Sequence, residues 1–358
     1  MPAGQARSRG GRRSDALRGQ AHSRSRQTPE HASAPWAEAH QAIARARDVE
    51  SRGARQGLRA TAGHSTGARR GRRNGRRRPT VAVSSTYEAL LLDLDGTLLD
   101  GRGEVRPRNR VALCELEARG VLVMIVTGRS AKAALPIVEG LGLTAPTVVF
   151  NGAAVYCPKH RGLIEERVLS NAAMGRALAF SAERDLLTLV MTRDRKLALE
   201  PRTDAESRAL RGLVGLELVD RAELAVEYVL RVSWLSASHA HSGVLAAEVE
   251  AHVAHPATYT HFPLSLVAEH RESAMQVCDM HAPCRGKGEA LRFVEERYGI
   301  LPGRVAAVGD ATNDLEMFEA SGFAVCMGSG MHEARTAADL VIGDHDSDAI
   351  AEWIAETF

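Results

Sequence analysis

The stretch from Ala89 to Leu92, with the acidic residues that follow it, constrains the fold of this chain more than any other feature. Four apolar residues run directly into Asp93, a second carboxylate follows at Asp95, and Gly96 comes next. A short apolar run bounded by turn residues is typical of a strand buried on both faces of a parallel sheet. Because side chains alternate along a strand, Asp93 and Asp95 are expected on the same side.

Carboxylates in this position indicate a ligand site. Open α/β sheets bind their ligands at the carboxyl ends of parallel strands, and glycine lets the chain leave the sheet in a conformation that other residues resist. We therefore expect Asp93 and Asp95 to line such a site. The alternative is a strand that ends in a solvated Asp-x-Asp-Gly turn, and the remainder of the chain argues against it.

Strand and helix patterns alternate after this first strand. Further apolar runs cover residues 121–126, 147–150 and 305–308, with helix-like segments between the first three strands. This order is typical of a parallel sheet with right-handed crossovers. We therefore predict an α/β fold with a Rossmann-like parallel sheet.

The pattern becomes more mixed in the middle of the chain. Residues 168–276 combine strand-like and helix-like segments without the regular alternation, and we predict that they form an inserted α+β cap domain. The catalytic core is then expected to consist of residues 81–167 and 277–358.

Residues 1–80 differ in charge from the rest of the chain. They contain 19 arginines and 5 acidic residues, a net charge of +14, whereas the remaining 278 residues carry −12, so that the total is +2. Because the segment has no sustained apolar period, we expect a disordered Arg-rich tail. Three interpretations stay open: a nonfunctional tail or wrongly assigned start, a targeting segment, or an arm that contacts nucleic acid. Only this tail favours nucleic acid, which we do not expect to be a principal partner.

The cysteines and the hydropathy pattern bear on the compartment. Five cysteines are scattered and odd in number, which favours a reducing environment over a disulfide framework. No apolar segment approaches the length of a membrane span, and we expect a cytoplasmic protein without a membrane partner. Cys278 and Cys284 flank His281 in a faintly zinc-like spacing, but the absence of a nearby second ligand pair argues against structural zinc.

Further polar residues stand at expected strand ends or helix starts. They are Thr127 and Gly128 after the second strand, Lys287 at a helix start, and Asp310, Asn313 and Asp314 after the late strand. Together with Asp93 and Asp95, this set suits a doubly charged oxyanion and a hard cation. Mg²⁺ prefers carboxylates and phosphate oxygens, and lysine supplies a point charge. One carboxylate can attack phosphorus while a second transfers the proton.

These motifs resemble those of the haloacid dehalogenase superfamily. The segments Asp93–Thr97, Thr127–Arg129, Lys287 and Gly309–Asp314 stand in the family's order. The large insertion, with Asn151-Gly152-Ala153 before it, is similar to the Cof-type (IIB) branch. The resemblance covers about residues 88–356 and leaves the tail unexplained.

The resemblance implies roles for the individual residues. Asp93 would be the nucleophile and Asp95 the general acid and base. The metal would be held at Asp93, the main-chain carbonyl of Asp95 and Asp310, with Asp314 supporting Lys287 or the metal's waters. The phosphoryl oxygens would be held by Thr127, Gly128, Lys287 and Asn313.

The function implied is that of a Mg²⁺-dependent phosphatase that hydrolyses a small phosphorylated metabolite, a sugar phosphate or cofactor phosphate, through an aspartyl-phosphate. A phosphomutase of the same superfamily is the alternative, because it would share every core residue. A nucleic-acid-associated protein acting through the basic tail is a second alternative. Removal of residues 1–80 distinguishes the enzyme from the nucleic-acid-associated protein: phosphatase activity should survive, whereas nucleic-acid affinity should be lost.

Overall fold

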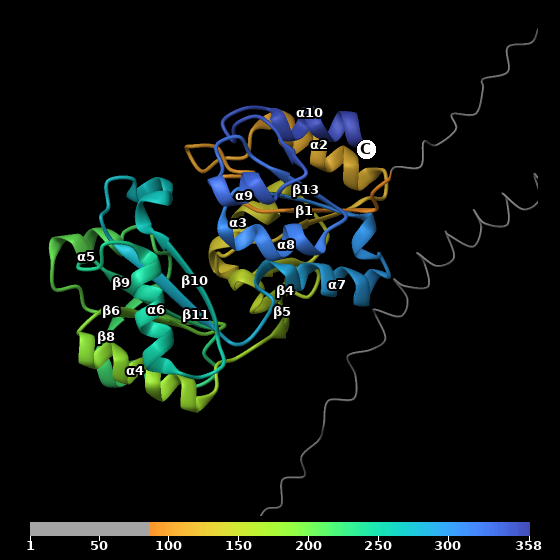
Figure 1. Ribbon diagram of the computed structural model, residues 1–358. Helices are drawn as coiled ribbons and strands as arrows, with labels where there is room; N and C mark the ends of the chain where they lie inside the picture. The colour runs from red at the N-terminus through yellow and green to blue at the C-terminus, as the bar shows by residue number, and fades with distance from the viewer. Residues whose placement is uncertain (1–85) are drawn as a thin grey trace, which may run out of the picture. The chain divides into compact units, whose positions relative to one another are not determined.

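The computed structural model describes residues 86–358. The expectation of a disordered tail in residues 1–80 therefore lies outside the described residues. The described chain forms three sheets with helices around them (Figure 1). Its α-helices are α2 (Pro107–Ala118), α3 (Ala131–Leu141), α4 (Asn171–Arg184), α5 (Asp204–Ala209), α6 (Ser242–Val253), α7 (Glu289–Tyr298), α8 (Leu315–Ala320), α9 (His332–Ala337) and α10 (Ala349–Thr357).

The first sheet has five parallel strands in the order β14-β13-β12-β1-β2. Their bounds are β1 (Ala89–Leu92), β2 (Leu122–Ile125), β12 (Val305–Gly309), β13 (Phe323–Cys326) and β14 (Leu340–Val341). The prediction of a parallel α/β sheet is confirmed. Because β1 lies between β2 and β12, the acids after β1 lie between the ends of two neighbouring strands.

Burial on both faces explains why β1 is apolar throughout. All four of its residues are 0% exposed. Leu90 and Leu92 belong to the core cluster that includes residues of α2 and α10, whereas Ala89 and Leu91 belong to the cluster built with α7 and α8. A strand covered by helices on both sides needs an apolar residue at every position.

A separate three-stranded antiparallel sheet follows the first two strands of the core. It consists of β3 (Thr147–Val149), β4 (Ala154–Cys157) and β5 (Gly162–Glu166). We expected residues 147–150 to add a full strand to the parallel sheet, but β3 reaches that sheet through one parallel bridge, Val126–Val148. An apolar run specifies burial and leaves the pairing partner open, and here β4 takes most of the pairing.

The third sheet has six strands in the order β10-β11-β9-β6-β7-β8. Their bounds are β6 (Leu187–Met191), β7 (Lys196–Leu199), β8 (Leu216–Val219), β9 (Arg231–Ser236), β10 (Thr258–Pro263) and β11 (Gln276–His281). Helices α4 and α6 lie along this sheet in Figure 1, and Phe180 of α4 packs edge-on against Trp234 of β9. The domain boundary expected from the sequence, between residues 276 and 277, falls within β11. Because β11 pairs with β9 and β10, the six-stranded sheet extends to His281.

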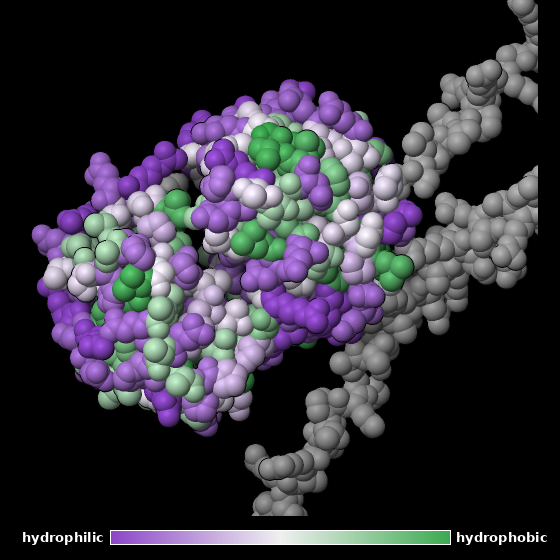
Figure 2. Space-filling view, in the orientation of Figure 1, coloured by the Kyte–Doolittle hydropathy of each residue, from purple (hydrophilic) through white to green (hydrophobic). Residues whose placement is uncertain are grey.

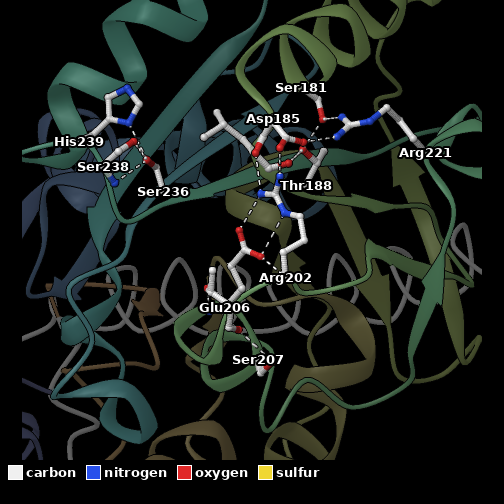
Figure 3. A network of polar contacts seen from close by, with 12 residues as sticks. Ser181, Asp185, Thr188, Arg202, Glu206, Ser207, Arg221, Ser236, Ser238 and His239 are labelled. Atoms are coloured by element: carbon white, nitrogen blue, oxygen red, sulfur yellow. Dashed lines mark hydrogen bonds and ion pairs between the residues drawn. The ribbon is translucent and has the colours of Figure 1, made fainter.

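A polar network fixes the end of α4 to two following loops (Figure 3). Asp185 caps α4 in the left-handed conformation. Arg221 donates to the Asp185 carboxylate at 3.0 Å and to Ser181 Oγ at 2.8 Å, and Arg202 donates to the Asp185 carbonyl at 2.6 Å. Cations at a helix C-terminus also interact favourably with its dipole. The inserted region thus has polar bracing of its own.

On the face shown in Figure 2, apolar side chains form small separate patches among hydrophilic ones. The most exposed large apolar residues, Tyr228 at 73% and Val214 at 69%, are single positions in the six-stranded region. Scattered apolar residues of this kind are ordinary for a protein surface. Within residues 86–358, no helix is long and apolar enough to cross a bilayer.

Candidate active site

The ends of three neighbouring parallel strands bring the predicted residues to one edge of the sheet. Leu92 is level with Val308 and with Ile125 in the two strand pairings. Asp93 directly follows β1, Thr127 lies two residues after β2, and Asp310 directly follows β12. Parallel register therefore places these three residues side by side at the carboxyl edge, where ligands of such sheets bind.

Lys287 joins two of the acids from the other side. It lies in the turn Gly286–Gly288 before α7, is 1% exposed, and its Nζ lies 2.6 Å from Asp93 Oδ1 and 2.6 Å from Asp314 Oδ1. Burial alone would lower the pKa of Lys287, but the carboxylates of Asp314 and Asp93 outweigh it and raise that pKa. A buried ammonium is stable only when it is paired in this manner.

Three carboxylates nevertheless share this small space. Oxygens of Asp93, Asp310 and Asp314 all lie within 4.8 Å of one another. Burial is the main cause that raises the pKa of Asp93 to about 7; Asp314 and Asp95 raise it further, and Lys287 opposes them. Burial, Asp93 and Asp314 together raise the pKa of Asp310 well above its usual value. One ammonium does not balance three carboxylates, and the donor set fits an added hard cation.

Asp314 is already well supplied with hydrogen-bond donors. Its Oδ1 accepts from Lys287, and its Oδ2 accepts from the backbone N–H groups of Asp310 at 2.9 Å and Ala311 at 3.0 Å. The carboxylate sits against the end of β12, where a Cβ on Gly309 would lie 2.4 Å from the Asp314 Cγ. Asp314 thus fixes both Lys287 and the loop that carries Asp310.

The loop after β1 packs tightly against Asp310. Gly96 has φ +77°, and a Cβ at that position would lie 2.4 Å from Asp310 Oδ2. Thr97 Oγ1 donates a hydrogen bond to Asp310 Oδ1 at 3.1 Å. Glycine is required here for both its left-handed backbone and its lack of a side chain.

Asp95 lies further out than Asp93 and has a different partner. Its side chain is 53% exposed, against 5% for Asp93. The Arg129 guanidinium donates to both of its carboxylate oxygens, at 2.8 and 2.5 Å. The two acids are chemically identical, so their environments distinguish them: Asp93 faces a buried ammonium and Asp95 faces the surface.

Thr127 and Gly128 form the turn after β2 that was expected to contact an anion. Thr127 is fully buried, and its Oγ1 accepts from the Arg129 backbone N–H at 3.1 Å, which leaves its own hydroxyl proton to donate. A Cβ on Gly128 would lie 2.9 Å from Asn151 Oδ1. The turn thus brings backbone and hydroxyl donors close to the acids.

Asn151 links this turn to Asn313 and to the six-stranded sheet. Its Oδ1 accepts from Asn313 Nδ2 at 3.2 Å, and its Nδ2 donates to Thr260 Oγ1 of β10 at 3.2 Å. Asn151 has φ +49°, a left-handed conformation that asparagine tolerates. The sequence motif that contains Asn151 does not by itself give this residue a role, although its position in an Asn-Gly pair after a strand is a visible signal.

Zinc binding by the Cys278, His281 and Cys284 group finds no support among residues 86–358. The metal-compatible groups there are the Asp93 cluster and the surface group Asp344–Asp346. Cys278 and His281 lie three residues apart on β11 and so point to opposite faces.

Comparisons with known proteins bear on the sequence and on the fold. The sequence model of the haloacid dehalogenase-like hydrolases matches residues 90–354. The pyridoxal phosphate phosphatase YbhA of Escherichia coli K12 is 26% identical over 277 residues, which cover 75% of this chain and 98% of that protein. A solved structure of a haloacid dehalogenase subclass IIB sugar phosphatase superposes with a TM-score of 0.63 at 18% identity, covering 75% of this chain and 98% of its own.

A plant relative is longer. The chloroplastic endoribonuclease YBEY of Arabidopsis thaliana is 22% identical over 300 residues, which cover 75% of this chain. The match spans only 46% of that protein, so this chain corresponds to less than half of it.

Proposed function

Because this chain belongs to the haloacid dehalogenase-like hydrolase family and is a phosphoric monoester hydrolase, we propose that it hydrolyses a small phosphorylated metabolite with Asp93 as nucleophile and Mg²⁺ as cofactor. The observation that carries the proposal is the position of Lys287 between Asp93 and Asp314, with Asp310 alongside. Relatives named as phosphatases of pyridoxal phosphate and of a phosphoribitylamino-uracil support a cofactor phosphate or sugar phosphate as substrate class.

In the first step, an Asp93 carboxylate oxygen attacks phosphorus and the ester P–O bond breaks. Asp95 donates a proton to the departing alkoxide, which leaves as an alcohol. In the second step, Asp95 takes a proton from water, the water oxygen attacks phosphorus, and the bond to Asp93 breaks with release of inorganic phosphate. The exposed position of Asp95 supports this assignment, because a leaving group must be able to reach it.

The phosphoryl oxygens would be bound by donors that converge from separate elements. Lys287 supplies the charge, Thr127 its hydroxyl proton, Gly128 its backbone N–H and Asn313 its amide. Asn151 orients Asn313 through the 3.2 Å hydrogen bond. The role of Gly128 depends on its lack of a side chain, because a Cβ would contact Asn151.

The residues present fit a magnesium ion at Asp93 and Asp310, together with the carbonyl of Asp95. When bound, Mg²⁺ would neutralise phosphoryl charge and align the ester with its nucleophile. Since the oxygens of Asp314 accept from Lys287 and from two backbone N–H groups, we assign Asp314 a supporting role rather than that of a ligand.

Phosphate release from p-nitrophenyl phosphate tests the proposal. Wild-type protein should be active with Mg²⁺, lose activity in a chelator, and regain it when Mg²⁺ is restored. Asp93→Asn should abolish turnover, whereas Asp204→Asn, an exposed position on α5, should not. Turnover by Asp93→Asn, or full activity in the chelator, would overturn the scheme. With a sugar phosphate as substrate, transfer of the phosphoryl group to another hydroxyl of the sugar without phosphate release would indicate the phosphomutase instead.

A further inference from the structure

Four residues form a row across the six-stranded sheet. His281 of β11 is level with Arg231 of β9, Arg231 with Met191 of β6, and Met191 with Lys196 of β7. Residues directly opposite one another on neighbouring strands point to the same face. Three basic side chains therefore share one face and one level of the sheet.

This face lies opposite to the helices of the inserted region. Trp234, three residues after Arg231 on β9, points to the other face and packs against Phe180 of α4. Arg231 instead reaches the turn that follows β2. Its Nη1 donates to the Gly128 carbonyl at 2.9 Å, and its guanidinium lies 5.4 Å from the centre of the Phe150 ring. The row thus borders the turn that carries Thr127.

The row has more hydrogen-bonding groups than the described residues provide partners for. Arg231 Nη1 pairs with Asp279 at 3.3 Å and Nη2 donates to Met191 Sδ at 3.0 Å, whereas Nε is buried without a hydrogen-bond partner among residues 86–358. The His281 ring is 0% exposed, and neither of its nitrogens has a partner there. A buried polar group without a partner costs free energy, so an unfilled set of this kind indicates a ligand.

Lys196 adds a charge that no acid compensates in that part of the chain. It is 7% exposed, and no acidic group of the described residues acts on its charge beside Arg231 and Lys132. Burial, followed by the charges of Arg231 and Lys132, lowers its pKa to about 8. Lys132 itself donates to the backbone carbonyl of Asp194. Since Asp279 balances only Arg231, the row retains a net positive charge.

We propose that Lys196 and Arg231 bind a second oxyanion of the substrate, a carboxylate or a second phosphate. The inference rests on the proposed function and narrows its substrate class to phosphate monoesters that carry another acidic group. Lys196 and Arg231 lie two strands apart, about 10 Å between backbones, and both side chains are long enough to converge on one anion over Met191. His281, which is fully buried, lies beyond Arg231 at the opposite end of the row from Lys196.

Matched substrate pairs test this proposal. 3-Phosphoglycerate against glycerol 3-phosphate tests a carboxylate, and fructose 1,6-bisphosphate against fructose 6-phosphate tests a second phosphate. Wild-type protein should favour the diacidic member of one pair. Lys196→Met should lower kcat/KM for that member by about 10- to 100-fold, the range for a hydrogen bond to a charged group, mainly through KM. Lys196→Arg should retain the preference.

Two controls make the result specific. Turnover of p-nitrophenyl phosphate, which lacks a second anion, should be unchanged in Lys196→Met, and the exposed Lys159→Met should behave as wild type with every substrate. An absence of preference in both pairs, or an equal loss for monoacidic and diacidic esters, would overturn the proposal. Lys196→Met should fold, because it removes a costly buried charge.

A binding measurement separates this proposal from the proposed function. By calorimetry in the Asp93→Asn background, Lys196→Met should raise the Kd of the preferred diacidic ester at least tenfold and leave that of its monoacidic partner unchanged. If p-nitrophenyl phosphate were not hydrolysed but this difference in Kd appeared, the phosphatase mechanism would fail and the anion site would stand. If the diacidic ester had the same Kd in Asp93→Asn and in Asp93→Asn with Lys196→Met, the anion site would be refuted and the phosphatase mechanism would be unaffected.

Discussion

Arg129 holds Asp95 by two hydrogen bonds, from Nε at 2.8 Å and from Nη2 at 2.5 Å. The two residues follow different strands of the parallel sheet and lie 34 positions apart. Because the Asp95 side chain is half exposed, the pair contributes little to stability. The pair instead fixes positions: Arg129 keeps the Asp95 carboxylate near the surface, while Lys287 holds the Asp93 carboxylate in the interior.

Asp95→Asn should separate the two steps of hydrolysis. Asp93 keeps its contact with Lys287 in this variant, so a substrate with a good leaving group should still phosphorylate it. Release should be slow, because loss of a general base costs about 10²–10⁴-fold. Mass spectrometry should find one added phosphoryl group on the peptide that contains Asp93. Wild-type turnover in Asp95→Asn, or an adduct in Asp93→Asn, would contradict the assigned roles.

Lys287→Met should reduce both stability and activity. The substitution leaves the buried carboxylates of Asp93 and Asp314 without their shared cation. Removal of one partner from a buried ion pair costs about 3–5 kcal/mol, measurable by urea unfolding in the absence of added metal. Lys159→Met, on the surface, should change the free energy of unfolding by less than about 0.5 kcal/mol. A Lys287→Met protein as stable and active as wild type would show that the buried pairing is not required.

Gly152→Ala should disturb the turn that carries Lys287. Gly152 has φ +92°, and a Cβ there would lie 2.0 Å from the Gly286 carbonyl oxygen. Gly120 has nearly the same φ, +90°, with no atom within 4 Å of its Cβ position. The left-handed backbone lowers the free energy of unfolding of both alanine variants by about 1–2 kcal/mol. Only Gly152→Ala also displaces the neighbouring turn.

The comparison of these two variants isolates the steric contact. Gly120→Ala should keep the wild-type kcat, whereas Gly152→Ala should lose more stability and lower kcat. Thermal melting and phosphate release measure the two effects. Equal losses in both variants would mean that backbone strain alone accounts for them, and that the close approach of Gly152 to Gly286 has no role in positioning Lys287.

The parallel sheet could be predicted because short stretches of the sequence specify its strands. The run Ala89–Leu92 specifies a strand buried on both faces, and the acids at its end mark the ligand edge. Pairing of the later strands could not be predicted in the same way. An apolar run such as residues 147–149 indicates a buried strand. Which strand it pairs with depends on other chain segments that compete for the same sheet edge.

Contacts between distant segments explain the other omissions. Thr260 lies 109 residues from Asn151, and Arg231 lies 103 residues from Gly128. Neither residue of the six-stranded sheet stands in a recognisable motif, and only the folded chain shows that they face the turn after β2. The row of Lys196, Arg231 and His281 is likewise a product of strand register.

The stability of Lys196→Met relative to wild type should depend on pH. In the folded protein, burial, Arg231 and Lys132 lower the pKa of Lys196 from 10.5 to about 8. Below pH 8 the folded and unfolded states both carry the proton, so the full cost of the buried charge is present. Between pH 8 and 10.5 the folded state releases its proton first, and the cost declines. Lys196→Met should therefore be more stable than wild type at pH 7, by a margin that narrows as the pH rises towards 10.5.

Urea unfolding at pH 7 and pH 10 measures this margin. Methionine preserves most of the side-chain length, so the difference reports chiefly on the charge. Lys159→Met should show no comparable change between the two pH values, since Lys159 is exposed. A margin that widens with pH, or a Lys196→Met protein less stable than wild type at pH 7, would mean that an acidic group compensates Lys196 in the free protein. The row would then have no unfilled charge with which to bind a second anion.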